Sequence, residues 1–254
     1  MRSVLDRSIF REATTDSGAL AIMNSIVHRM ADQGDYRGTV YRGEARVGTF
    51  LVSVHDNPEG PGAERDALPR QATVDLAALD GSAGGAPGDC QAAFSLAAGG
   101  HLVLSVSAGS GRYAVEIVRR ERRKEPAKVF DSQALGAGDI FVATLVRPGT
   151  YRVRDLLGNG QAELTVEYPE SGRLAARARP VVVECGEGAM DPAAVRIQPG
   201  QALMFSCRRE CRIAIDLERA DDRRPPGRRP AAAPAPAAKK GKTRRVLRRI
   251  RFYG

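Results

Sequence analysis

Apolar and polar residues alternate along most of the chain after Gly38, as they do in β-strands. The stretch "TVYRGEARVGTFLVSV" (39–54) alternates around two glycines, and "ATVDLAAL" (72–79) follows a Pro/Gly-rich loop. Between 90 and 169, glycine and proline turns separate strands expected at 91–97, 101–107, 112–118, 139–146, 150–155 and 161–167. Three or four more strands are expected within 181–218. Short, evenly spaced strands of this kind predict a mainly β chain containing a β-sandwich.

Two segments near the N-terminus show a helical period instead. Ser3 and Asp6 resemble a capping box, which predicts a helix over 3–13. In 17–31 the apolar residues recur at three- and four-residue spacing, which predicts an amphipathic helix. Such a helix either packs on the protein's own β-core or docks a partner, and the first arrangement is the commoner one.

Composition divides the chain into four parts. A Gly-rich segment at 80–89 separates a helical and stranded N-terminal module, 1–79, from a β-sandwich at 90–169. A partial second β-sandwich is expected at 181–218. A Pro/Ala-rich linker and a basic tail, expected to be disordered, occupy 223–254.

Part of the chain is repeated. The sequence "FSLAAGGHLVLSVSAGSGRYAVEIV" from Phe94 aligns with "VRIQPGQALMFSCRRECRIAIDLE" from Val195, with Gly99 on Gly200 and 112–117 on 212–217. The second copy lacks the later strands of the first. We therefore expect a partial sandwich that N-terminal strands or another chain could complete.

Two motifs resemble the cupredoxin-like family. "LVRPGTYRVRD" (145–155) and "LGNGQAELTV" (157–166) are similar to its late motif and closing strand. The resemblance covers about 90–169, with a partial second copy at about 183–218, and implies a β-sandwich. Asp155 stands where the family has its cysteine ligand, and Arg112 or Tyr113 where its first histidine would be. A blue-copper site needs two imidazoles and a thiolate, so the resemblance implies the fold without copper, and we expect no cofactor.

Three cysteines are the remaining candidates for a metal or redox site. Cys207 and Cys211 are spaced C-x₃-C, and Cys185 lies on a nearby expected strand. Structural zinc requires four Cys or His ligands, and no histidine lies near these three. The alternative, which we favour, is a hairpin with two cysteines near its base that pair if oxidised. The histidines share no local spacing that suggests a metal or a general base, and we expect no enzymatic activity.

The positive charge is concentrated at the C-terminus. Residues 223–254 hold twelve of the 39 Lys and Arg residues and no acid, which leaves the body with 27 bases against 30 acids. Such asymmetry indicates a tail that seeks an anionic partner. No apolar run is long enough to span a membrane, and no clean secretory signal is present, so we expect a cytoplasmic protein.

The end of the tail combines cationic and apolar side chains. The partner-binding residues that we expect are Arg244, Arg245, Val246, Leu247, Arg248, Arg249, Ile250, Arg251, Phe252 and Tyr253. An acidic docking surface on a larger protein assembly fits this pattern. RNA or DNA fits through its phosphates and through stacking on the two aromatic rings. An anionic membrane fits less well, because the segment is short.

These observations favour a non-catalytic structural or accessory subunit, tethered to a larger assembly by its tail. A nucleic-acid-binding protein is the first alternative, and a thiol redox or metal-binding module is the second. The sequence also permits a homo-oligomer.

Overall fold

A computed structural model describes residues 13–57, 67–81, 90–120, 126–169 and 178–222. The expected tail and nearly all of the expected helix at 3–13 lie outside these residues. The described part of the chain is mainly β, as predicted, and its one α-helix is α1 (Leu76–Gly81), which contacts β4.

The longest sheet runs through the whole molecule. It has seven strands in the order β14 (Met190–Asp191), β13 (Val181–Cys185), β16 (Ala202–Cys207), β10 (Ile140–Thr144), β2 (Asn24–Met30), β7 (Gly100–Ser105) and β5 (Gln71–Asp75). Strands from both ends of the chain therefore share one hydrogen-bonded surface.

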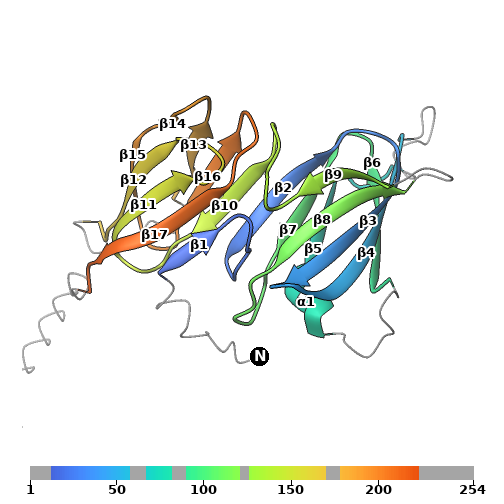
Figure 1. Cartoon of the computed structure of the whole chain (residues 1–254), viewed down its shortest axis with the longest axis horizontal. Helices are drawn as coiled ribbons and strands as arrows, with labels where there is room; N and C mark the ends of the chain where they lie inside the picture. The colour runs from blue at the N-terminus through green and yellow to red at the C-terminus, as the bar shows by residue number, and fades with distance from the viewer. Residues whose placement is uncertain (1–12, 58–66, 82–89, 121–125, 170–177, 223–254) are drawn as a thin grey trace, which may run out of the picture.

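Two five-stranded sheets complete the two sandwiches that lie side by side in Figure 1. One contains β6 (Ala92–Ala97), β4 (Ala45–His55), β3 (Gly34–Arg42), β8 (Ala114–Arg120) and β9 (Ala127–Asp131). The other contains β15 (Ala194–Ile197), β12 (Gln161–Val166), β11 (Gly149–Asp155), β17 (Ile213–Ala220) and β1 (Thr14–Asp16). Buried residues of both sandwiches form a single hydrophobic cluster, so one apolar core extends across the molecule.

The two sandwiches have the same topology. In each, the five-stranded sheet contains one parallel pair, β4 with β6 or β12 with β15, and the seven-stranded sheet supplies another, β5 with β7 or β13 with β16. Tyr36 and Tyr151 occupy equivalent places, and each hydroxyl donates to a carbonyl four residues earlier, Asp32 O at 2.7 Å and Arg147 O at 2.6 Å. The chain is thus a duplication, with β1 to β8 in the first copy and β9 to β17 in the second.

Each copy gives its first strand to the other sandwich. β1 pairs with β17, the last strand of the second copy, and β9 pairs with β8, the last strand of the first. After each exchanged strand, the sequence Asp-Ser-x-Ala-Leu makes the same contacts. The Ser17 hydroxyl accepts from Ile213 N at 3.0 Å, and the Ser132 hydroxyl accepts from Val115 N at 2.9 Å.

β2 and β10 join the two halves at the centre of the long sheet (Figure 1). Ile26 lies opposite Phe141, Val27 opposite Ile140 and Ser25 opposite Val142. Val27 and Val142 hold equivalent places in the two copies. An approximate two-fold axis therefore passes through the Ile26–Phe141 pair.

The amphipathic helix expected at 17–31 is wrong, because this segment contains β2. Met23 adopts φ 67°, a value that no right-handed helix contains. From Asn24 onward, alternate side chains enter the core, with Ile26 and Met30 buried. The apolar Val27 points to the opposite face. When both faces of a strand carry apolar residues, their spacing along the sequence resembles that of an amphipathic helix.

The expected boundary at 80–89 does not separate sheets. β4, which precedes it, pairs with β6, which follows it, and strands at 140–166 belong with those at 181–220. The strands expected at 90–169 are therefore real but are divided between the two sandwiches. The second copy is consequently complete and not partial.

Candidate partner-binding face

The outer side of the seven-stranded sheet has an uncharged centre. It is made by uncharged, partly exposed outward side chains of β7, β2, β10 and β16. The two other outward residues of these strands, Arg29 and His101, are exposed at its edge. We call this surface the neutral face, and its residues are Val103, Ser105, Ser25, Val27, Ile140, Val142, Thr144, Ala202, Met204 and Ser206.

Strand alternation positions these side chains. On the same four strands the intervening residues, such as Leu104, Ile26, Phe141 and Phe205, are fully buried in the core. Because successive side chains of a strand point to opposite faces, the partly exposed residues must line the outer side. Pairing registers place them in rows across the sheet, with Val27 between Val103 and Ile140 in one row.

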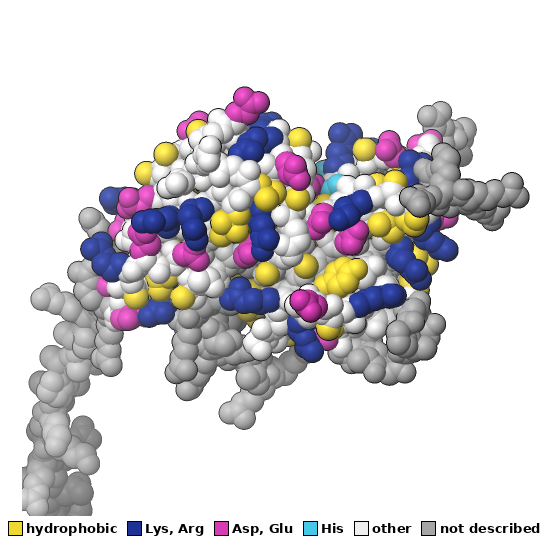
Figure 2. Space-filling model, viewed as in Figure 1, with side chains coloured by type: hydrophobic (Ala, Val, Ile, Leu, Met, Phe, Trp, Pro, Cys, Tyr) yellow, Lys and Arg dark blue, Asp and Glu magenta, His cyan; other side chains and the backbone are white. Residues whose placement is uncertain are grey.

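The two five-stranded sheets have outer faces of a different character. Across β11 and β17, Arg152 pairs with Glu218, and Arg154 pairs with Asp216 at 2.6 Å. On the other sheet, Lys128 bridges Glu116 at 3.4 Å. Figure 2 shows basic and acidic side chains interspersed over one face of the molecule. The neutral face therefore departs from the pattern of the protein's other sheet surfaces.

Charged groups reappear only around the neutral face. Arg29 on β2, Asp75 on β5 and Glu184 on β13 point outward on strands that also border or cross it. Val182, which is 48% exposed, extends the apolar surface onto β13. An uncharged centre with a charged rim is the usual composition of a protein interface.

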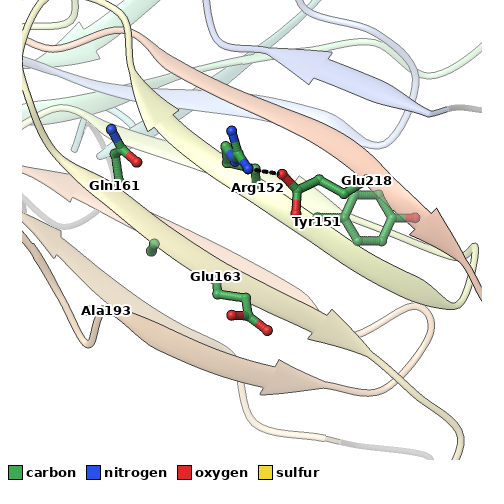
Figure 3. Close-up of a pocket in the computed structure, with 7 residues that line it drawn as sticks. Tyr151, Arg152, Gln161, Glu163, Ala193 and Glu218 are labelled. Atoms are coloured by element: carbon green, nitrogen blue, oxygen red, sulfur yellow. Dashed lines mark ion pairs between the residues drawn. The ribbon is translucent and has the colours of Figure 1, made fainter.

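A polar groove lies on the outer face of the second five-stranded sheet (Figure 3). It has a volume of about 290 Å³, and its lining includes Arg152, Gln161, Glu163 and Glu218. Arg152 and Glu218 point toward one another and form an ion pair. Because these two side chains neutralise one another, neither is left to bind a charged ligand in the groove.

The three candidate cysteines lie together but do not form an open site. Cys207 and Cys211 form a disulfide, and Cys185 is the register partner of Cys207 on the neighbouring parallel strand. All three are buried. Burial raises the pKa of the Cys185 thiol to about 12, with Asp155 adding to the effect and Arg209 opposing it. Such a thiol is almost wholly protonated at neutral pH, so it is a poor nucleophile or metal ligand.

Asp155 has a structural role. Its side chain is 3% exposed and accepts from Arg209 Nη2 at 2.7 Å. It also accepts backbone N–H groups from Arg212 at 3.0 Å and Leu157 at 3.1 Å. These contacts tie the β11–β12 turn to the loop that carries the disulfide.

Histidine also contributes to the joint between the two copies. His28 Nδ1 lies 2.7 Å from Asp139 Oδ1, and the His28 ring lies 4.7 Å from that of Phe130. His55 and His101 are exposed and lie on different strands. Within the described ranges, no group of three or more His, Cys, Asp or Glu side chains is arranged to hold a metal.

The partner-binding residues expected at 244–253 lie outside the described residues. The described chain ends beside β11, where Asp221 N donates to Pro148 O at 2.9 Å and Arg147 pairs with Asp222. Among the residues that the structure describes, no helix is long and apolar enough to cross a membrane.

Sequence reasoning missed the neutral face. Two of its residues lay inside the segment interpreted as a helix, and the others were counted only as strand residues. A usable signal was present, because the outward positions of β10 and β16 contain no Lys, Arg, Asp or Glu.

Comparison with known proteins found no match to this chain among family models, curated proteins or solved structures.

Proposed function

We propose that the protein is a non-catalytic structural or accessory subunit of a larger assembly. The observation that carries this proposal is the neutral face, because an uncharged sheet surface flanked by charges suits burial against another protein. The basic segment at 244–253 serves as a second attachment, to an acidic surface of the assembly. The two contacts together would hold the subunit more firmly than either alone.

The cupredoxin-like assignment forms the finer part of this proposal. Asp155 pairs with Arg209. The hydroxyl of Tyr113, which with Arg112 is a candidate for the place of the family's first histidine, donates to Asp80 Oδ2 at 2.9 Å. These contacts support a cupredoxin-like sandwich without copper. In it, the residues that stand in the places of the family's metal ligands stabilise loops and strands.

We also propose a cytoplasmic location. The Cys207–Cys211 disulfide counts against it, because disulfides are rare in the cytosol. The tail fits the cytoplasm if its partner is an assembly found there.

Native size measures the proposed function directly. In extract from the native source, the tagged chain should elute well above its 27.2 kDa mass. Nuclease should leave that size unchanged. Val142→Arg, which puts a charge on the neutral face, and truncation after Asp222 should each reduce it. Thr165→Arg on the outward side of β12 is the matched control and should not.

Two results would count against the proposal. Collapse of the large species with nuclease would identify a nucleic-acid-binding protein. Elution at the size of a single chain in every sample would show that the protein is not part of a larger assembly.

A further inference from the structure

We propose that the partner of the neutral face is the neutral face of a second copy of this chain. This inference rests on the proposed function, since it names the occupant of the same surface. The resulting dimer packs the two seven-stranded sheets face to face.

Charge is the first reason. The face has no charged side chain at its centre, so it offers nothing to select an acidic or a basic partner. An uncharged surface is, however, compatible with itself, whereas the charged outer faces of the five-stranded sheets would bring like charges together. The same lack of acids makes the basic tail a poor occupant.

Internal symmetry is the second reason. The approximate two-fold axis through Ile26 and Phe141 relates the half containing Val27 and Val103 to the half containing Val142 and Met204. The halves match at Val27 and Val142, at Val103 and Met204, and at Ser105 and Ser206. They differ at the edge, where Arg29 and His101 stand in place of Thr144 and Ala202. A second copy that packs on this face therefore meets the same uncharged centre whichever half it approaches, and the contact closes as an isologous dimer.

Shape is the third reason. Sheets bury apolar faces by packing on other sheets about 10 Å away with a small angle set by their twist. A second copy presents a sheet of the same width and the same twist. A single helix would leave most of a face that spans four central strands uncovered.

The area available places the contact among weak, reversible interfaces. The six strands from β5 to β13, which carry the neutral face and its charged rim, are spaced about 4.8 Å apart and are about 17 Å long. They present about 500 Å² per copy, of which the four strands of the neutral face supply about 330 Å². The total of about 1,000 Å² lies at the lower limit for a specific interface. We therefore expect reversible association that depends on concentration, with a dissociation constant in the micromolar range.

Sedimentation velocity on the purified full chain, treated with nuclease, tests the dimer. We expect a monomer–dimer equilibrium that persists at high salt, because apolar contacts are not screened as phosphate or acidic contacts to the tail are. Val142→Arg and Val27→Arg should each weaken association at least tenfold and to a similar extent, since they hold equivalent places. Thr165→Arg should leave the equilibrium unchanged, and circular dichroism should show all three variants folded.

The dimer would be overturned if the chain stayed monomeric at every concentration up to about ten times the expected micromolar dissociation constant. So would a dimer that both arginine variants leave intact. If the pure chain is monomeric while the large species in extract still depends on Val142, the self-association is wrong and the proposed function stands. If the pure chain dimerises but no larger species exists in extract, the proposed function is wrong and the dimer stands.

Discussion

Asp155 shows how one residue can report on both fold and function. In the sequence it stands in a motif that resembles the late cupredoxin motif, and together with the missing histidines it led us to expect no copper. Its actual partners could not be predicted, because Arg209 lies far along the chain on a loop between β16 and β17. A pairwise contact of this kind leaves no period or motif in the sequence.

Replacing Asp155 with alanine should lower the free energy of unfolding by about 2–4 kcal/mol. The change strands a partly buried guanidinium and two backbone N–H groups that the carboxylate now satisfies. Denaturant titration measures the loss. Asp216→Ala, which removes an exposed carboxylate from its pair with Arg154, is the control and should cost less than about 1 kcal/mol. Equal losses in the two variants would refute the structural role given to Asp155.

At the scale of elements, the exchanged strands depend on two equivalent serines. Ser17 and Ser132 are both fully buried, and each hydroxyl accepts a backbone N–H from the neighbouring core segment, that of Ile213 or Val115. Changing either serine to alanine leaves a buried donor unpaired, which should cost about 1–3 kcal/mol. Because the two sites are copies, the two losses should agree within about 0.5 kcal/mol.

Thermal or denaturant unfolding of the two variants makes this comparison. Ser53→Ala is the control, since its hydroxyl donates to Asp35 at an exposed site. A loss confined to one serine would contradict the equivalence of the two exchanged strands.

Sequence patterns predicted where the strands lie in the sequence better than they predicted which strands pair. The expected strands at 139–146, 150–155 and 161–167 match β10, β11 and β12 closely. The helix at 17–31 was wrong because β2 has apolar side chains on both faces, one for the core and one for the neutral face. Exchange of first strands was also invisible, since pairing between β1 and β17 joins opposite ends of the chain.

The repeat shows the same limit at the scale of the whole molecule. Aligning Gly99 with Gly200 was correct, and both have positive φ. For the next strand, however, the serine contacts make Val115 equivalent to Ile213, so Arg112 does not correspond to Arg212. A shift by two residues keeps the same side chains facing inward, and a pattern of period two cannot detect it.

Exchange of strands, the β2–β10 pairing and the shared core should make the two sandwiches unfold as one unit. Leu96 is fully buried on β6, an edge strand of the first sandwich, and Leu96→Ala should destabilise by about 2–5 kcal/mol. The reporter is Cys185 in the second sandwich, in a Cys90→Ser background that leaves it as the one free thiol. Its burial and its pKa of about 12 protect it from alkylation near pH 8 until the fold opens, when its pKa falls toward about 8.5.

Alkylation of Cys185 across a denaturant series, without reductant, then measures whether damage in one sandwich opens the other. If the halves are one cooperative unit, Leu96→Ala lowers the midpoint of Cys185 exposure as much as it lowers the midpoint seen by circular dichroism. The exposed neighbour variant Ser95→Ala should move neither midpoint. Independent halves would leave the Cys185 midpoint where it was while circular dichroism shifted. That outcome would mean that the exchanged strands and the central sheet connect the two copies without coupling their stability.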